Sequence, residues 1–99
     1  MADDVTVVLG EHAVDDLRRV RDRYAAIDPA LSDEFALAFD AVLERIRIFP
    51  HGAPPVDRFP GLRRARMRRV PYGVLYRDTD ETMTVVRVLH NARDTVHLP

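Results

Sequence analysis

Cysteine and lysine are absent from this chain of 99 residues, and serine occurs once, as Ser32. Without cysteine there is no disulfide framework, thiolate nucleophile or zinc–thiolate site, which fits a reducing compartment. Without lysine there is no Schiff-base residue, and the lysine-containing phosphate loop is excluded. Ser32 is followed by Asp33 and Glu34, a context typical of a helix start rather than of a nucleophile elbow, so we expect no serine hydrolase.

Metal-ligand spacings and long apolar runs are also missing. The four histidines, His12, His51, His90 and His97, form no known ligand pattern, so we expect no metal and no cofactor. No apolar run approaches the roughly 18 residues of a membrane helix. The first four residues are acidic overall, where a signal peptide would be basic. We therefore expect a cytoplasmic chain without a membrane partner, folded as a single domain of residues 1–99.

Arginine is concentrated in one short segment. All 15 basic residues are arginine, and the formal net charge is −1. Residues 58–77 contain seven arginines and no acidic residue, whereas residues 1–57 and 78–99 have an excess of acidic residues. A patch of one sign attracts phosphates or an acidic protein. The alternative is a strand whose solvent-facing side happens to carry arginine.

The hydrophobic pattern predicts an α+β fold with the element order β-α-α-β-β-β. Residues 5–9 form a β-rich run that ends at Gly10. Two amphipathic helices follow, separated at Asp28 and Pro29, because aspartate is a good N-cap and proline suits the first helical position. Pro50 ends the second helix. The expected apolar stripes are Ala13, Leu17, Val20, Tyr24 and Ile27 on the first helix and Leu31, Phe35, Phe39, Val42, Ile46 and Phe49 on the second.

Three further strands are expected after a proline-rich loop at residues 51–60. They are residues 62–70, 72–76 and 83–89, with a turn at residues 78–82. Consecutive strands favour an antiparallel meander, here an antiparallel sheet covered on one face by the helix hairpin. The first strand is expected at an edge or in the centre of this sheet.

Alternation along the first of these three strands predicts a row of arginines. Arg64, Arg66 and Arg68 share one face, while Ala65 and Met67 share the other. Side chains two residues apart on a strand lie about 6.6 Å apart. Such a row can bind successive phosphates, because each guanidinium binds oxygens through two N–H groups and keeps its charge. It can equally bind the carboxylates of a partner segment.

The second helix carries a weaker apolar seam away from its main stripe. Leu37, Ala41 and Ile48 fall together at about 100° per residue, next to Glu44. One interpretation is scattered surface hydrophobics. The other is a docking surface for a helix of a partner.

His90, Arg93 and Asp94 follow the last strand. A histidine here can exchange protons near neutral pH. Alternatively its ring bonds a backbone group and orders the turn. Arg93 and Asp94 can likewise form only a surface pair of little energetic value.

Three motifs together identify a family. They are the Phe-Pro-Gly-Leu-Arg run at residues 59–63, the Arg-Arg-Val-Pro-Tyr-Gly-Val-Leu-Tyr-Arg run at residues 68–77, and the Val-Arg-Val-Leu-His-Asn-Ala-Arg-Asp run at residues 86–94. With the element order, they make the chain resemble the RelE/ParE superfamily of toxins from bacterial type II toxin–antitoxin systems. The Val-Arg-Val-Leu-His segment at residues 86–90 and the short tail at residues 95–99 resemble the ParE-like branch.

One branch of this superfamily, the RelE-like toxins, cleaves messenger RNA in the ribosomal A site. In that branch the resemblance implies catalytic roles for Arg64, Arg66, Arg68, His90 and Arg93. The chain departs from the RelE pattern, however, at three positions.

Gly73 and Asn91 stand where RelE-like enzymes often have arginine, and His97 stands near a position often filled by tyrosine. Loss of one oxyanion contact typically costs about 2.7–4 kcal/mol. These departures weigh against the RelE-like reaction unless Arg68, His90 or Arg93 substitutes for the missing groups.

The other branch, the ParE-like toxins, inhibits DNA gyrase and needs no nuclease centre. Both branches imply a cognate antitoxin with an acidic or amphipathic segment. We expect that segment to contact the seam of Leu37, Ala41 and Ile48, an exposed strand edge, or the arginine row. A binding module without toxicity is the third possibility.

Overall fold

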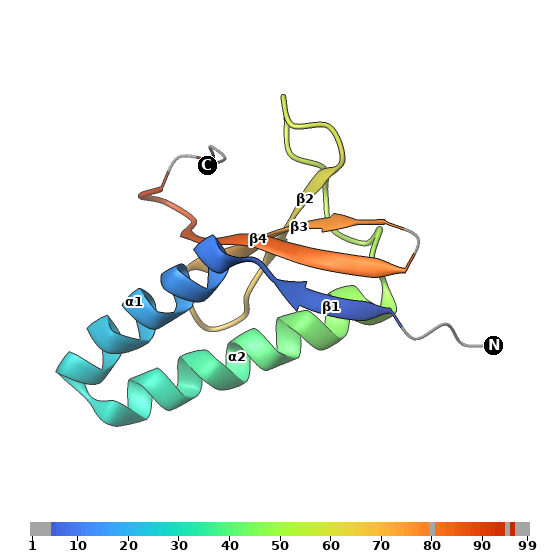
Figure 1. The fold of residues 1–99 in the computed structure, drawn as a ribbon. Helices are drawn as coiled ribbons and strands as arrows, with labels where there is room; N and C mark the ends of the chain where they lie inside the picture. The colour runs from blue at the N-terminus through green and yellow to red at the C-terminus, as the bar shows by residue number, and fades with distance from the viewer. Residues whose placement is uncertain (1–4, 80, 95, 97–99) are drawn as a thin grey trace.

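The computed structural model describes residues 5–79, 81–94 and 96 (Figure 1). The elements are β1 (Thr6–Leu9), α1 (Glu11–Ile27), α2 (Pro29–Ile48), β2 (Leu62–Arg66), β3 (Tyr72–Asp78) and β4 (Thr82–His90). The predicted α+β class and the order β-α-α-β-β-β are confirmed. No helix of the described residues is long and apolar enough to cross a membrane.

The four strands form one sheet in the order β1-β4-β3-β2. β2, β3 and β4 make the predicted antiparallel meander, with Arg64 opposite Leu75 and Tyr72 opposite His90. β1 lies at an edge and runs parallel to β4, so the sheet is mixed but mostly antiparallel. Parallel pairing requires a crossover between the two strands, and here the helix hairpin and the first two strands of the meander lie between β1 and β4.

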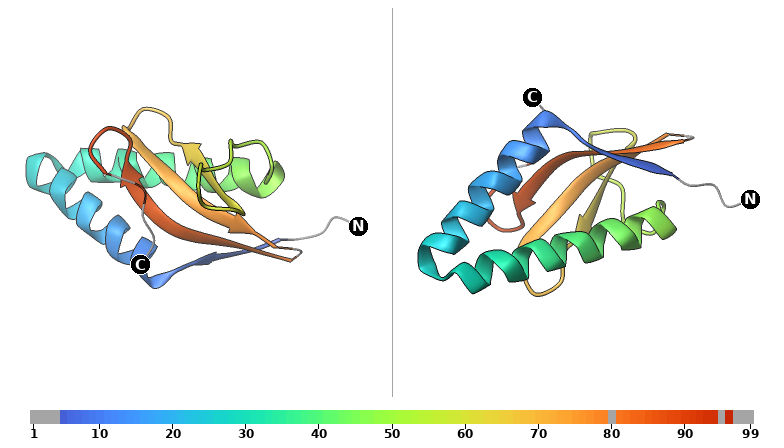
Figure 2. Two further views of the ribbon diagram at one scale, coloured as in Figure 1. Left: turned by 90° about the horizontal axis from the view of Figure 1, so that it is seen from above. Right: turned by 60° about the horizontal axis from the view of Figure 1, so that its bottom comes forward.

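The two helices cover one face of the sheet (Figure 2). The Asp28 carboxylate accepts a hydrogen bond from the Ala30 N–H at 3.0 Å, and Pro29 occupies the first turn of α2. The chain therefore reverses within a single residue between α1 and α2, as the sequence predicts. Pro50 follows shortly after the end of α2 at Ile48.

The core lies on both faces of the sheet. The larger cluster fills the space between helices and sheet, with Phe35, Tyr76 and Met83 fully buried. A smaller cluster of Leu62 and Leu75, joined by Leu89, lies on the opposite face. The loop after α2 covers it with Val56 and Phe59 and the end of the chain with Val96, while Val86 packs against it from β4.

Two residues of the predicted helix stripes are exposed instead of buried. Ile27 is 72% and Phe49 67% exposed. Ile27 ends α1 in the hairpin turn, which projects beyond the sheet in Figure 1. Phe49 is the C-cap of α2, and its non-helical backbone takes its side chain off the stripe.

The predicted strand at residues 62–70 is too long, because β2 ends at Arg66. Met67 still donates its N–H to the Tyr72 carbonyl at 2.9 Å, and residues 68–71 then reverse the chain. Arg69 has a φ of 72°, which no strand residue adopts. Arg68 therefore lies in the connection to β3 and not on the strand.

Candidate functional site

Two members of the predicted arginine row, Arg64 and Arg66, share one face of β2. Ala65, between them, is buried in the larger core cluster, so both arginines point away from the helices. Arg66 is exposed and Arg64 half-buried. Burial, and then the neighbouring charge of Arg66, lower the pKa of Arg64. Arg68 is exposed, but in the connection after the strand.

Arg64 makes a specific contact across the sheet. Its Nη2 donates to the Asn91 Oδ1 at 3.0 Å. Its Nε is buried and has no hydrogen-bond partner among the described residues. A Cβ atom on Gly73 would lie 2.9 Å from the Asn91 Oδ1 and 3.0 Å from the Arg64 Nε. The three positions therefore converge, and a side chain at position 73 would require the Asn91 and Arg64 side chains to shift.

Sequence analysis missed Asn91 as the partner of Arg64. The two residues are 27 positions apart, and only the pairing of β2, β3 and β4 brings them together. A signal was present, because a glycine inside an apolar strand often marks a close approach of neighbouring atoms. Gly73 has this role.

A groove of about 560 Å³ lies beside the arginines, between the end of α2, the following loop and β2. Its apolar lining includes Ile46, Phe49 and Pro55, while Arg64 and Arg66 lie on its β2 side. The loop is held in place, since the Tyr76 hydroxyl donates to the Pro50 carbonyl at 2.6 Å. The groove thus combines apolar surface with positive charge.

The same loop covers part of the outer edge of β2. Arg64 donates its N–H to the Pro54 carbonyl at 3.1 Å, and Val56 donates to the Leu62 carbonyl at 2.8 Å. A partner strand cannot add here without displacing the loop. Within the described chain, β1 is the other edge strand and pairs on one side only, with β4.

The predicted seam of Leu37, Ala41 and Ile48 lies on the surface of α2. Leu37 is 69% and Ile48 53% exposed. Ile48 is followed directly by the exposed Phe49, which lines the groove. Exposed apolar surface therefore continues from α2 to the groove.

His90 lies on the other face of the sheet from Arg64, the face covered by the helices. Its ring packs edge-on against Tyr72, with 5.1 Å between ring centroids. Its Nδ1 accepts hydrogen bonds from the N–H groups of Ala92 and Arg93, both at 3.1 Å, so the neutral ring carries its proton on Nε2. His90 thus orders the turn after β4. Arg93 is exposed in that turn.

The candidate catalytic residues do not form one cluster. Arg64 and Arg66 lie together on one face, whereas His90 and Arg93 line a different hollow, beside α1. His97 lies outside the described residues. In residues 5–79, 81–94 and 96, no group of three or more histidine, aspartate or glutamate residues could hold a metal ion.

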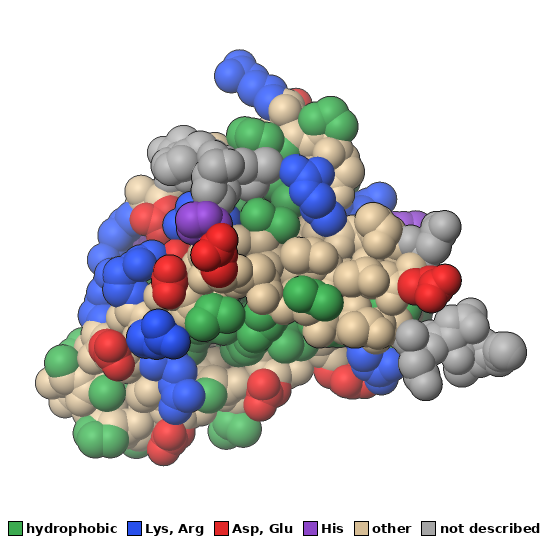
Figure 3. Space-filling view, in the orientation of Figure 1, with side chains coloured by type: hydrophobic (Ala, Val, Ile, Leu, Met, Phe, Trp, Pro, Cys, Tyr) green, Lys and Arg blue, Asp and Glu red, His purple; other side chains and the backbone are tan. Residues whose placement is uncertain are grey.

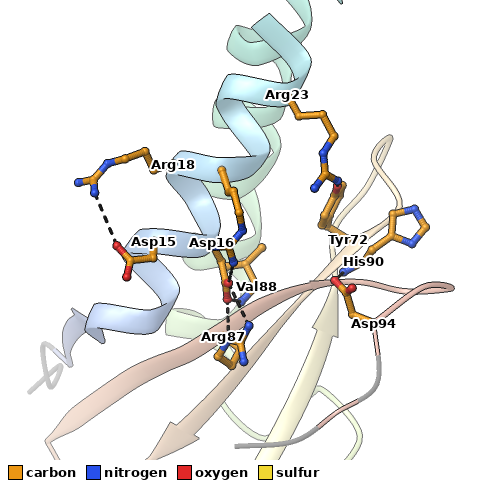
Figure 4. A network of polar contacts seen from close by, with 10 residues as sticks. Asp15, Asp16, Arg18, Arg23, Tyr72, Arg87, Val88, His90 and Asp94 are labelled. Atoms are coloured by element: carbon orange, nitrogen blue, oxygen red, sulfur yellow. Dashed lines mark hydrogen bonds and ion pairs between the residues drawn. The ribbon is translucent and has the colours of Figure 1, made fainter. Parts of the chain in front are cut away.

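A buried aspartate that sequence analysis missed joins α1 to β4. Asp16 accepts from the Arg87 Nε at 2.7 Å, from the Arg87 Nη2 at 3.0 Å and from the Val88 N–H at 2.9 Å, and also from Arg19 (Figure 4). The hydrogen bonds between Arg87 and Asp16 raise the pKa of Arg87, whereas burial lowers it. β1 pairs with β4 only as far as Val85, so Asp16 satisfies a backbone group beyond the end of β1.

The sequence contains a signal for Asp16. It stands three residues after Ala13 and four before Val20, both buried, so it falls on the buried side of α1. A carboxylate in such a position needs a cationic partner.

Comparisons with known proteins agree with this fold. No curated protein sequence matches the chain. The solved structure of the chromosomal ParDE TA system from P. aeruginosa matches with a TM-score of 0.74, over 88% of this chain and 96% of that chain, at 17% identity. This similarity shows a shared fold. The family model of the ParE toxin of the type II toxin–antitoxin system, parDE, matches residues 7–95. The predicted relation to the RelE/ParE superfamily, in its ParE-like form, is confirmed, and the chain belongs to the ParE toxin family.

Proposed function

We propose that the chain inhibits growth by acting on DNA gyrase in the cytoplasm and does not cleave messenger RNA. The arrangement of Arg64, Gly73 and Asn91 carries this proposal. Cleavage of a phosphodiester requires cations at the developing oxyanion and groups that transfer protons. The Arg64 guanidinium contacts the Asn91 amide, and the Asn91 oxygen obstructs a side chain at position 73. Arginine itself is no proton acceptor, because it keeps its charge.

Gyrase is the target that the ParE-like resemblance implies. An inhibitor needs a binding surface and no catalytic geometry. The exposed Arg66 and the apolar groove beside it supply such a surface. A guanidinium row at the rim of an apolar groove suits an acidic protein surface better than a bare phosphate chain.

A ribosome-dependent nuclease is the second candidate. Arg66 favours it, because its exposed guanidinium lies near Arg64 and could bind a phosphate. This function would need a proton acceptor on the same face as Arg64. His90 lies on the other face, and its Nδ1 already accepts two backbone hydrogen bonds.

Induction of the chain in growing cells separates the two candidates. Two quantities are measured after induction: the supercoiling of a reporter plasmid and the 5′ ends of messages. We expect plasmid relaxation with intact messages. New message ends at A-site codons that disappear in Arg66→Ala would replace the gyrase proposal with the nuclease. Arg18→Ala is the matched control, because Arg18 is an exposed arginine on α1 that pairs with Asp15.

We further propose that a cognate antitoxin covers the groove and the seam of α2 together. Exposed apolar surface at Leu37, Ile48 and Phe49 leads into the groove, and Arg66 adds positive charge at its rim. The occupant that fits both is an amphipathic acidic segment, whose apolar side contacts α2 and whose carboxylates meet the arginines. The seam is a small exposed apolar patch, which suits the apolar side chains of a partner.

Calorimetry with the product of the neighbouring reading frame tests this surface. The double variant Leu37→Asp with Ile48→Asp is expected to weaken binding at least tenfold, and Arg66→Glu by a similar factor. Ile27→Asp is the matched control, because Ile27 is 72% exposed but lies in the hairpin turn. Equal affinity for the seam variant and the control would exclude α2 as a docking site.

A further inference from the structure

A second hollow, of about 310 Å³, lies between α1 and the end of β4. Arg19 and Arg23 line it from α1, Arg87 from β4 and Arg93 from the turn that follows. Arginine side chains gather over α1 at the left of Figure 3, with acidic side chains between them. We call this hollow the basin. It lies beside α1 and shares no lining residue with the groove.

The basin has an excess of positive charge. Its lining contains four arginines and two acidic residues, Asp16 and Asp94, so its formal charge is 4 − 2 = +2. Asp16 is also fully engaged, since four hydrogen bonds occupy its two oxygens. One oxygen of Asp94 accepts the His90 N–H at 2.8 Å. Asp16 is therefore bound within the fold by both oxygens, and the exposed Asp94 by one.

The basin has more free hydrogen-bond donors than free acceptors. The Arg23 Nη1 donates to the Tyr72 hydroxyl at 3.0 Å, which leaves the other donors of that guanidinium and the hydroxyl proton of Tyr72 (Figure 4). The Arg93 side chain makes no hydrogen bond or ion pair with any residue that the structure describes. His90 keeps a proton on Nε2. A site with more free hydrogen-bond donors than acceptors suits a ligand that only accepts hydrogen bonds.

Arg23 and Arg93 line the same hollow although α1 and the turn after β4 are far apart in sequence. The pKa of the Tyr24 hydroxyl is raised mainly by burial, and the charges of both arginines act against that rise. Two like charges that line one hollow repel each other, and a bound dianion reduces that repulsion.

We propose that the basin binds the phosphate group of a small molecule, with Arg23 and Arg93 as its principal contacts. A guanidinium group donates two parallel hydrogen bonds to the oxygens of one phosphate. Arg87 and Arg19 keep Asp16 as their hydrogen-bond partner. They attract the phosphate electrostatically and do not bind it directly. The volume lies at the lower end of the roughly 300–1,000 Å³ of small-molecule sites, so the basin accepts a phosphate with little attached to it. This proposal does not depend on the target of the toxin.

Calorimetric titration with inorganic pyrophosphate tests the proposal. We expect binding that weakens at least tenfold in Arg23→Ala and in Arg93→Ala, with partial retention in Arg93→Lys because the charge remains. Arg18→Ala should bind like the unmodified chain, since Arg18 lies outside the basin and pairs with Asp15. Circular dichroism checks that each variant is folded, and Arg93→Ala, an exposed turn position, carries the test if Arg23→Ala does not fold.

Three results would overturn the proposal. The first is the absence of saturable binding at millimolar pyrophosphate, and the second is an equal affinity in the basin variants and Arg18→Ala. The third comes from a parallel titration with single-stranded DNA. If affinity rises with oligonucleotide length and depends on Arg23 and Arg93 in the same way, the basin contacts a nucleic-acid backbone and not a small molecule.

Discussion

The two arginine clusters of this chain differ in their relation to acidic residues. On β2, neither Arg64 nor Arg66 forms an ion pair with a carboxylate of the residues that the structure describes, and Arg64 contacts the neutral amide of Asn91. At the junction of α1 and β4, Arg87 is bound by the buried Asp16 through two hydrogen bonds. The difference separates two uses of one residue type. An arginine with a buried acid holds elements together, whereas an exposed arginine without one is available to a partner.

The largest expected effect concerns Asp16. Asp16→Ala leaves Arg87 and the Val88 N–H without their acceptor, and breaking a buried ion pair typically costs about 3–5 kcal/mol of unfolding free energy. Asp15→Ala is the matched control one position away, because the exposed Asp15–Arg18 pair in Figure 4 is worth less than about 1 kcal/mol. Urea unfolding measures both. Similar losses for the two variants would contradict a structural role for Asp16.

A smaller effect is expected where β3 approaches Arg64. Gly73→Ala places a Cβ atom against Asn91 and Arg64, and such overpacking costs about 1–3 kcal/mol. The same unfolding experiment measures the loss. If Gly73→Ala is as stable as the unmodified chain, position 73 has room for a side chain, and the main argument against a nuclease centre fails.

Asn91→Ala should cost about 0.5–1.5 kcal/mol, because Arg64 then loses a hydrogen bond but is only half-buried. A double-mutant cycle with Arg64→Ala isolates the contact. We expect the two losses to be less than additive. Full additivity would mean that Arg64 and Asn91 do not interact in solution.

The smallest effect on stability is expected for the exposed residues of the partner surface. Leu37→Ala and Arg66→Ala should each change the unfolding free energy by less than about 0.5 kcal/mol, because neither side chain is buried. Thermal unfolding checks this. A large loss for either variant would place that residue in the fold rather than in a binding surface.

Local signals in the sequence predicted much of this architecture. Asp28 and Pro29 located the helix junction, and alternation placed Arg64 and Arg66 on one face. The end of β2 was not predictable in this way, because arginine and methionine continue the alternation through the point where the chain turns. The edge position of β1 depends on pairing with β4, about 75 residues away, and no local pattern encodes it.

The candidate site was predicted only in part, for the same reason. The resemblance pointed to Arg64, Gly73 and Asn91 one by one, but the contact between them exists only in the assembled sheet. The basin was invisible to sequence analysis, since Arg23 and Arg93 come from opposite ends of the chain. Long-range pairing, and not residue type, decides which arginines become neighbours.

Titration of the purified chain into a gyrase supercoiling reaction tests the central claim most directly, with message integrity followed in a parallel translation reaction. The account predicts that supercoiling stops as the chain reaches the concentration of gyrase and that messages stay intact. Undiminished supercoiling at a large excess of the chain, together with message cleavage in the parallel reaction, would contradict it.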